Sequence, residues 1–208
     1  MKFLKYSIAF LIFVLLLWGA LVLFMPKDDG SFHVVLDPGH GGEDPGAVAG
    51  DVYEKNINLA IALMVRDNLS GQEGITVAMT RDDDSFPSLM ERAEFANKEN
   101  ADLFVSIHAN ALDDDTYSGL FTFYHADKRT SAKAADLIQN AASSESGAIN
   151  RGVRTENYVV LRETDMPAVL VETGFMTCPE ELALLIDAEY QAKIAKGISD
   201  GILAIASK

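Results

Sequence analysis

Residues 33–42 read HVVLDPGHGG, a short apolar run that stops at a proline and a glycine. No polar residue interrupts the run between His33 and Asp37, so a strand there would be buried on both faces. Proline and glycine then end the strand, and the glycines that follow let the backbone turn sharply around His40. We therefore expect a strand over residues 33–37 that delivers His40 to the rim of a covered, parallel sheet.

The rest of the chain alternates between strand-like and helix-like stretches. Apolar residues predominate at 75–80, 103–107, 120–124, 158–161 and 168–171, where we expect further strands. Helices are expected at residues 56–69, 89–100, 130–143 and 188–206, and another begins near Pro179, a residue suited to the first helical position. This alternation predicts an α/β fold, in which one largely parallel sheet is covered by helices.

Composition narrows the class of protein. The 208 residues carry a formal net charge of −14, and 49% of them are apolar. These values exclude a disordered chain and argue against nucleic-acid binding. Without the first 27 residues, residues 28–208 suffice for one globular domain. Cys178 is the single cysteine, so any metal site must be built from His, Asp and Glu.

The first 27 residues have the pattern of a membrane segment. Residues 6–26 contain no charge, and Lys2 and Lys5 precede them. About 20 apolar residues span a bilayer as a helix, and the bulky sequence LFMP at residues 23–26 is a poor cleavage site. We expect a transmembrane anchor with its N-terminus in the cytoplasm and residues 28–208 outside. A signal helix that is cleaved to release a secreted protein is the alternative.

Four polar residues stand where expected elements begin or end. His40 and His108 follow strands, Glu172 follows the last strand, and Glu54 opens the first long helix. Because ligands of open α/β sheets bind at the carboxyl ends of strands, these side chains are expected to converge at one rim. Two imidazoles and a carboxylate are a common catalytic zinc set, and Glu172 would serve as the base. Taken singly, each residue also has a structural interpretation, such as a first-turn helix acid for Glu54.

Four motifs occur in order along the chain: VLDPGHGG at residues 35–42, Glu54, SIHAN at 106–110 and PAVLVETGF at 167–175. Together they closely resemble the zinc-dependent N-acetylmuramoyl-L-alanine amidase family of the amidase 3 type. The resemblance covers about residues 33–205. Shorter motifs agree with the resemblance: Thr80-Arg81, Glu91-Arg92, NRGV at 150–153 and VLR at 160–162.

The resemblance implies a cofactor, a substrate and a fold. Zn²⁺ would be held by His40, Glu54 and His108, and Glu172 would be the catalytic glutamate. The family cleaves the amide between N-acetylmuramic acid and the L-alanine of the peptidoglycan stem peptide. The metal activates water, and the glutamate passes a proton to the alanine nitrogen. The implied fold is a single α/β domain with a mostly parallel sheet of about six strands.

Three further residues receive expectations from the same resemblance. Arg162 would orient Glu172 or bind a carboxylate of the stem peptide, with a plain surface salt bridge as the alternative. Asn110 is a candidate for a substrate contact or for orienting the site. Cys178 stands where members of the family often have Asn, and a role as an extra zinc ligand is a minor alternative.

Two other functions stay open. A zinc carboxypeptidase or other aminohydrolase would use the same metal chemistry. A catalytically inactive wall-binding module on a membrane tether would be expected to lack a ligand or the base, yet all four residues are present. The expected partners are peptidoglycan and, through residues 1–27, the membrane. No protein partner is inferred, the activity belongs outside the cytoplasm, and the sequence leaves open whether vegetative wall or spore cortex is cut.

Overall fold

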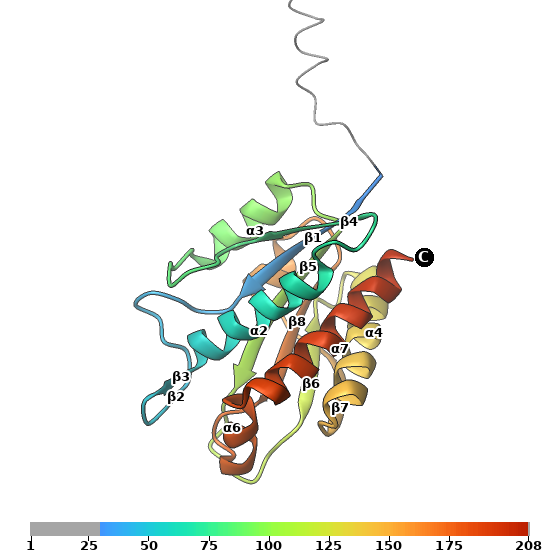
Figure 1. The fold of residues 1–208 in the computed structure, drawn as a ribbon. Coiled ribbons are helices and arrows are strands. Elements are labelled where there is room, and N and C mark those ends of the chain that lie inside the picture. Colours follow the sequence, from blue (N-terminus) through green and yellow to red (C-terminus); the bar gives the residue numbers. More distant parts are fainter. Residues whose placement is uncertain (1–29, 208) are drawn as a thin grey trace, which may run out of the picture. The chain divides into compact units, whose positions relative to one another are not determined.

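A six-stranded sheet forms the centre of the computed structural model, which describes residues 30–207. In the order β4-β1-β5-β8-β6-β7, the first four strands run parallel to one another. Strand β6 is antiparallel to β8, and β7 is parallel to β6. The predicted mostly parallel, six-stranded sheet of a single α/β domain is therefore confirmed (Figure 1). The strands are β1 (Phe32–Pro38), β4 (Ile75–Met79), β5 (Leu103–Asn110), β6 (Leu120–Tyr124), β7 (Asn150–Thr155) and β8 (Ala168–Phe175).

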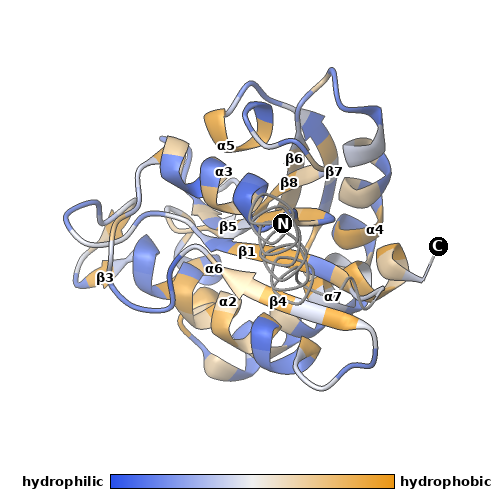
Figure 2. Ribbon diagram, turned by 90° about the horizontal axis from the view of Figure 1, so that it is seen from above, coloured by the Kyte–Doolittle hydropathy of each residue, from blue (hydrophilic) through white to orange (hydrophobic). Residues whose placement is uncertain are grey.

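Helices cover both faces of this sheet. Alternate residues of the central strands point to opposite sides, since Val34 and Leu36 join one apolar cluster and Val35 joins the other. The larger cluster packs under α2, α4 and α7, and the smaller one lies under α3 and α5 (Figure 2). The helices are α2 (Glu54–Leu69), α3 (Leu89–Lys98), α4 (Arg129–Ser146), α5 (Val159–Arg162), α6 (Pro179–Leu185) and α7 (Ala188–Ala206).

Local sequence signals account for where several helices begin and end. Ser88 and Glu91 form a reciprocal capping box at the start of α3. Asp187 accepts a hydrogen bond from the Tyr190 amide and so caps α7. Gly147 takes the left-handed conformation that ends α4. As expected, α6 begins at Pro179.

One expected strand is wrong, and one strand of the six-stranded sheet was not expected. The expected strand at residues 158–161 is replaced by the short helix α5 (Val159–Arg162), because a four-residue apolar run does not distinguish a strand from one helical turn against the sheet. The sixth strand is β7, whose sequence NRGVRT lacks a strong strand signal and is only partly buried. Strands β5 and β8 also continue beyond their expected ends, to Asn110 and Phe175.

The predicted membrane segment, residues 1–27, lies outside the described residues. Among residues 30–207, the structure contains no helix with the length and apolar character needed to cross a bilayer.

Candidate metal centre

The three predicted ligands meet at the carboxyl rim of the sheet. His40 follows β1, Glu54 is the first residue of α2, and His108 lies near the end of β5. One potential ligand atom from each residue lies within 4.8 Å of the others. The Nε2 atom of His40 is 3.1 Å from Oε2 of Glu54. The Nδ1 atom of His108 is 3.0 Å from Oε1 of Glu54. These residues can therefore hold a metal ion.

Backbone and side-chain donors hold the Glu54 carboxylate in place. A two-stranded hairpin, β2 (Val48–Ala49) with β3 (Val52–Tyr53), leads directly into α2. The Ala47 amide donates to Oε2 at 2.9 Å, and the Ala109 amide donates to Oε1 at 3.1 Å. Asn58, one turn further along α2, also donates to Oε1, at 3.0 Å.

The environment of Glu54 keeps it ionised. Its burial would raise the pKa of the carboxyl group, but hydrogen bonds from His108 and His40 outweigh that effect. The pKa of Glu54 therefore lies well below its usual range. A carboxylate must be ionised to bind a divalent cation, and Glu54 is ionised and oriented between two imidazoles.

His40 is held from behind by Asp44. Its Nδ1 atom lies 2.7 Å from Oδ2 of Asp44, so an Nδ1–H donor leaves Nε2 directed at Glu54. Burial alone would lower the pKa of His40, but its bond to Glu54 and the nearby charges raise the pKa to about 9. The backbone of His40 has φ of 61°, a left-handed conformation that non-glycine residues rarely adopt. Such strain at a ligand is typical of functional sites.

Gly39 lets His108 approach the loop after β1. A Cβ atom at Gly39 would lie 2.1 Å from Cε1 of the His108 ring, far inside van der Waals contact. The glycine after Pro38 therefore serves two purposes, because it ends the strand and leaves room for a ligand from the neighbouring strand.

Glu172 lies beside the three ligands on β8. It is the register partner of His108 on the adjacent strand, and the two side chains therefore point to the same face of the sheet. Glu172 is only 8% exposed, and its Oε2 atom has no hydrogen-bond partner among the described residues. Burial raises the pKa of Glu172 to about 7, against the lowering effect of His108. This carboxyl group can accept or return a proton near neutral pH.

A cavity of about 550 Å³ opens over Glu172 and includes His40 and His108 in its lining. Its other walls are largely apolar. One wall comes from the start of α3 and the segment before it, and the opposite wall comes from α5. The apolar lining residues include Phe86, Leu89, Tyr158, Val159, Val160 and Leu170. Two of the three candidate ligands, His40 and His108, therefore share one cleft with Glu172, and the cleft has room for a substrate.

Two other candidates do not reach the metal ligands. The Arg162 guanidinium donates to Glu163 at 2.7 Å and to the Asn157 side chain at 2.8 Å, and these partners direct it away from a pairing with Glu172. Arg162 therefore makes a surface ion pair, although Asn157 itself lines the cleft. The Asn110 side chain accepts a hydrogen bond from the next amide, that of Ala111. Roles for Arg162 and Asn110 toward a substrate stay predictions.

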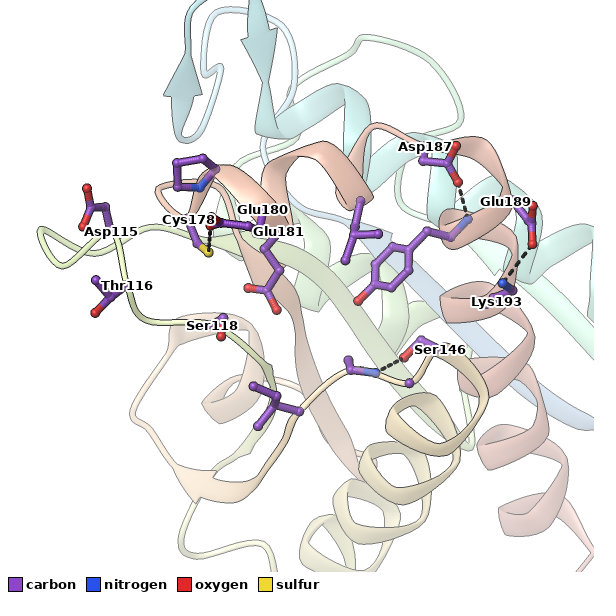
Figure 3. Close-up of a pocket in the computed structure, with 16 residues that line it drawn as sticks. Asp115, Thr116, Ser118, Ser146, Cys178, Glu180, Glu181, Asp187, Glu189 and Lys193 are labelled. Carbon is purple, nitrogen blue, oxygen red and sulfur yellow. Dashed lines mark hydrogen bonds and ion pairs between the residues drawn. The ribbon is translucent and has the colours of Figure 1, made fainter.

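Cys178 lies outside the metal group and lines a second cavity of about 850 Å³ (Figure 3). Its thiol is 3.4 Å from Oε2 of Glu180. The acidic residues of this second cavity are engaged in the fold, since Glu181 accepts from two backbone amides and Glu189 pairs with Lys193. Nothing in this cavity adds a ligand to the metal group.

Sequence reasoning missed two supporting residues. Asp44 and Asn58 each lie four residues after a ligand, His40 and Glu54 respectively, and each contacts that ligand. On α2 the spacing of four places Asn58 on the same helix face as Glu54, which is a usable signal. The contact of Asp44 depends on the turn between Gly41 and Asp44, which the sequence alone does not define.

Comparisons with known proteins point to one family. The chain is 38% identical over 173 residues to N-acetylmuramoyl-L-alanine amidase LytC of Bacillus subtilis (strain 168), covering 82% of this chain and 35% of LytC. It is 34% identical to the germination-specific N-acetylmuramoyl-L-alanine amidase of the same organism, covering 82% of this chain and 78% of that protein. The crystal structure of N-acetylmuramoyl-L-alanine amidase from Clostridium difficile 630 superposes with a TM-score of 0.83 at 39% identity, covering 85% of this chain and 97% of that one.

The first of these relatives is much longer than the present chain, which spans about a third of its length. The similarity nevertheless extends through the whole of the sheet and its helices. The family model described as N-acetylmuramoyl-L-alanine amidase matches residues 34–204, a range that includes all three candidate metal ligands and Glu172. The chain therefore belongs to the N-acetylmuramoyl-L-alanine amidase family.

Proposed function

We propose that this chain is a zinc-dependent amidase that hydrolyses the bond between N-acetylmuramic acid and the L-alanine of peptidoglycan stem peptides. One observation carries the proposal: in a chain of this family, His40, Glu54 and His108 converge, and the two histidines line one cleft with Glu172. The outcome of the reaction would be separation of the stem peptide from the glycan strand.

The chemistry of the donor set fits zinc. Two imidazole nitrogens and one carboxylate oxygen match a catalytic zinc site, which keeps one position open for water or substrate. The bond from His40 to Asp44 matches the carboxylate–histidine pairing that orients metal-bound imidazoles in many proteins. When bound, zinc supplies Lewis-acid polarisation of the scissile carbonyl and of water.

Glu172 is the proposed proton carrier. Glu172 lines the cleft, and its Oε2 atom has no hydrogen-bond partner among residues 30–207, so the carboxylate is available to take a proton from attacking water. The raised pKa then favours return of that proton to the alanine nitrogen, which must be protonated to leave as an amine. The apolar cleft walls limit competing water around the carboxylate.

The location of the reaction follows from the substrate. Peptidoglycan lies outside the cytoplasmic membrane, and residues 28–208 would form the catalytic domain there. The uncharged stretch 6–26 would anchor this domain, with cleavage of the stretch as a signal helix as the alternative. Both vegetative wall and spore cortex are candidate substrates.

Identification of the released ends tests the proposal. Purified residues 28–208 are incubated with peptidoglycan and zinc, and the new termini are labelled and identified. New L-alanine amino termini would support the amidase, whereas released C-terminal amino acids would indicate a carboxypeptidase. Binding to peptidoglycan without any release, in protein shown to contain zinc, would contradict both and indicate a wall-binding module.

A further inference from the structure

Two buried arginines lie directly beneath the metal-binding loop. Arg81 follows β4 and is 3% exposed, and Arg92 lies on α3 and is 2% exposed. The buried acid Asp37 pairs with Arg92, since its Oδ1 atom is 2.8 Å from Nη1 of Arg92. Asp37 also accepts hydrogen bonds from Thr80 and Ser106. Neither arginine is a candidate metal ligand or the proposed proton carrier.

Four of the eight hydrogen bonds that the two guanidinium groups donate go to backbone carbonyls of the loop. The other four go to the carbonyls of Asp83, Lys55 and Pro87 and to the Asp37 carboxylate. Pro38 accepts from Nε of Arg81 at 2.9 Å and from Nη1 of Arg92 at 2.8 Å. Gly39 accepts from Nη2 of Arg81 at 2.8 Å, and His40 accepts from Nη2 of Arg92 at 2.8 Å. The two planar guanidinium groups thus fix three consecutive backbone carbonyls, those of Pro38, Gly39 and His40.

Stability alone does not account for this arrangement. Asp37 pairs with Arg92 but not with Arg81, and burial followed by the charge of Arg92 lowers the pKa of Arg81. Buried ion pairs of this kind are often replaceable by apolar residues without loss of stability. What an apolar residue cannot do is direct the carbonyl of His40, and with it the left-handed backbone that presents the imidazole.

We propose that Arg92, assisted by Arg81, is a positioning residue that holds His40 in the conformation required for metal binding. The inference rests on the proposed zinc site. Arg92 acts through the His40 carbonyl and does not touch the metal ligand atoms. Its loss lowers the affinity of the folded protein for zinc, beyond any loss of stability.

The test compares R92K with the unmodified chain. Lysine keeps the charge but cannot form the fork that reaches Asp37, Pro38 and His40 together. Zinc affinity is measured by competition with a chromophoric chelator, and the folded fraction is measured by circular dichroism on the same samples. We expect R92K to bind zinc at least about tenfold more weakly while folded. The visible spectrum of bound Co²⁺ should also shift, because it reports the geometry of the ligands.

A control separates positioning from stability. I138A removes a buried side chain of α4, which packs on the other face of the sheet, and should lower the unfolding midpoint with zinc affinity unchanged. If R92K does not fold, R81K is measured in the same way, since its fork reaches Pro38 and Gly39. Equal zinc affinity and an equal Co²⁺ spectrum in the folded variant and the unmodified chain would overturn the positioning role alone. Failure of the unmodified chain to bind zinc would overturn the proposed function and this role with it.

Discussion

Replacing Asp44 with asparagine should weaken zinc binding and leave the fold intact. In the native chain, Oδ2 of Asp44 accepts from Nδ1 of His40 at 2.7 Å, which fixes the tautomer with Nε2 free. Asparagine is nearly the same size, and its oxygen can still accept from the Gly46 amide as Oδ1 of Asp44 does. Its NH₂ group cannot accept a hydrogen bond from the imidazole, so His40 loses its charged partner.

The magnitude follows from the geometry and the exposure of the pair. Loss of a carboxylate behind a metal-bound histidine typically lowers metal affinity 10- to 100-fold. The Asp44 side chain is 39% exposed, so water screens its charge and the loss should lie near the lower limit. We therefore expect about a tenfold rise in the zinc dissociation constant, or about 1.4 kcal/mol of binding free energy.

Chelator competition at fixed pH measures this change directly. D67N is the matched control, because Asp67 pairs with Arg66 on the surface and its side chain is 67% exposed. The control should retain native affinity, and both variants should unfold at nearly the native temperature without zinc. A dissociation constant for D44N within twofold of the native value would refute the claim that Asp44 orients the ligand.

Three further predictions concern the same cleft. E172Q should keep its zinc yet lose about 10²- to 10⁴-fold in the rate of release of L-alanine termini, and substantial residual hydrolysis would contradict the role of Glu172. Because the pKa of His40 is raised to about 9 in the metal-free chain, zinc must displace its proton, so affinity should rise about tenfold per pH unit between pH 6 and 8. A flat dependence in chelator titrations across that range would refute this expectation. G39A should force His108 aside, because a Cβ atom at residue 39 would lie 2.1 Å from the imidazole ring. The variant should bind zinc more than tenfold more weakly. Denaturant titrations should also show that the free energy of unfolding falls by about 1–3 kcal/mol.

Long or strongly patterned elements could be predicted from the sequence. The structure places α7 at Ala188–Ala206 and β6 at Leu120–Tyr124, with the bounds that the apolar pattern indicates. Short elements could not be predicted in this way. Residues 158–161 form a helical turn because they pack between α3 and β8, and this tertiary contact leaves no mark on a four-residue pattern.

The site shows the same division between local pattern and tertiary geometry. The ligands stand beside strand and helix boundaries, so their residue types and positions indicate a shared rim. Asp44 acts through a hydrogen bond that the turn between Gly41 and Asp44 sets. The hydrogen bonds of the two arginines form only when β1, β4 and α3 have come together. Arg81 and Arg92 are visible in the sequence as features of the family, but the carbonyls that they hold are not.

The strand order of the sheet has a consequence for how the chain folds. Strand β8 is the last to leave the ribosome, yet it lies between β5 and β6 and carries Glu172. Until it inserts, β5 and β6 lack their shared neighbour, and half of the sheet has no link to the other half. Pairing over so many intervening residues is slow, since the loop must close before any contact compensates for it. A chain that lacks β8 therefore cannot assemble the cleft, which needs Leu170 and Glu172 from that strand.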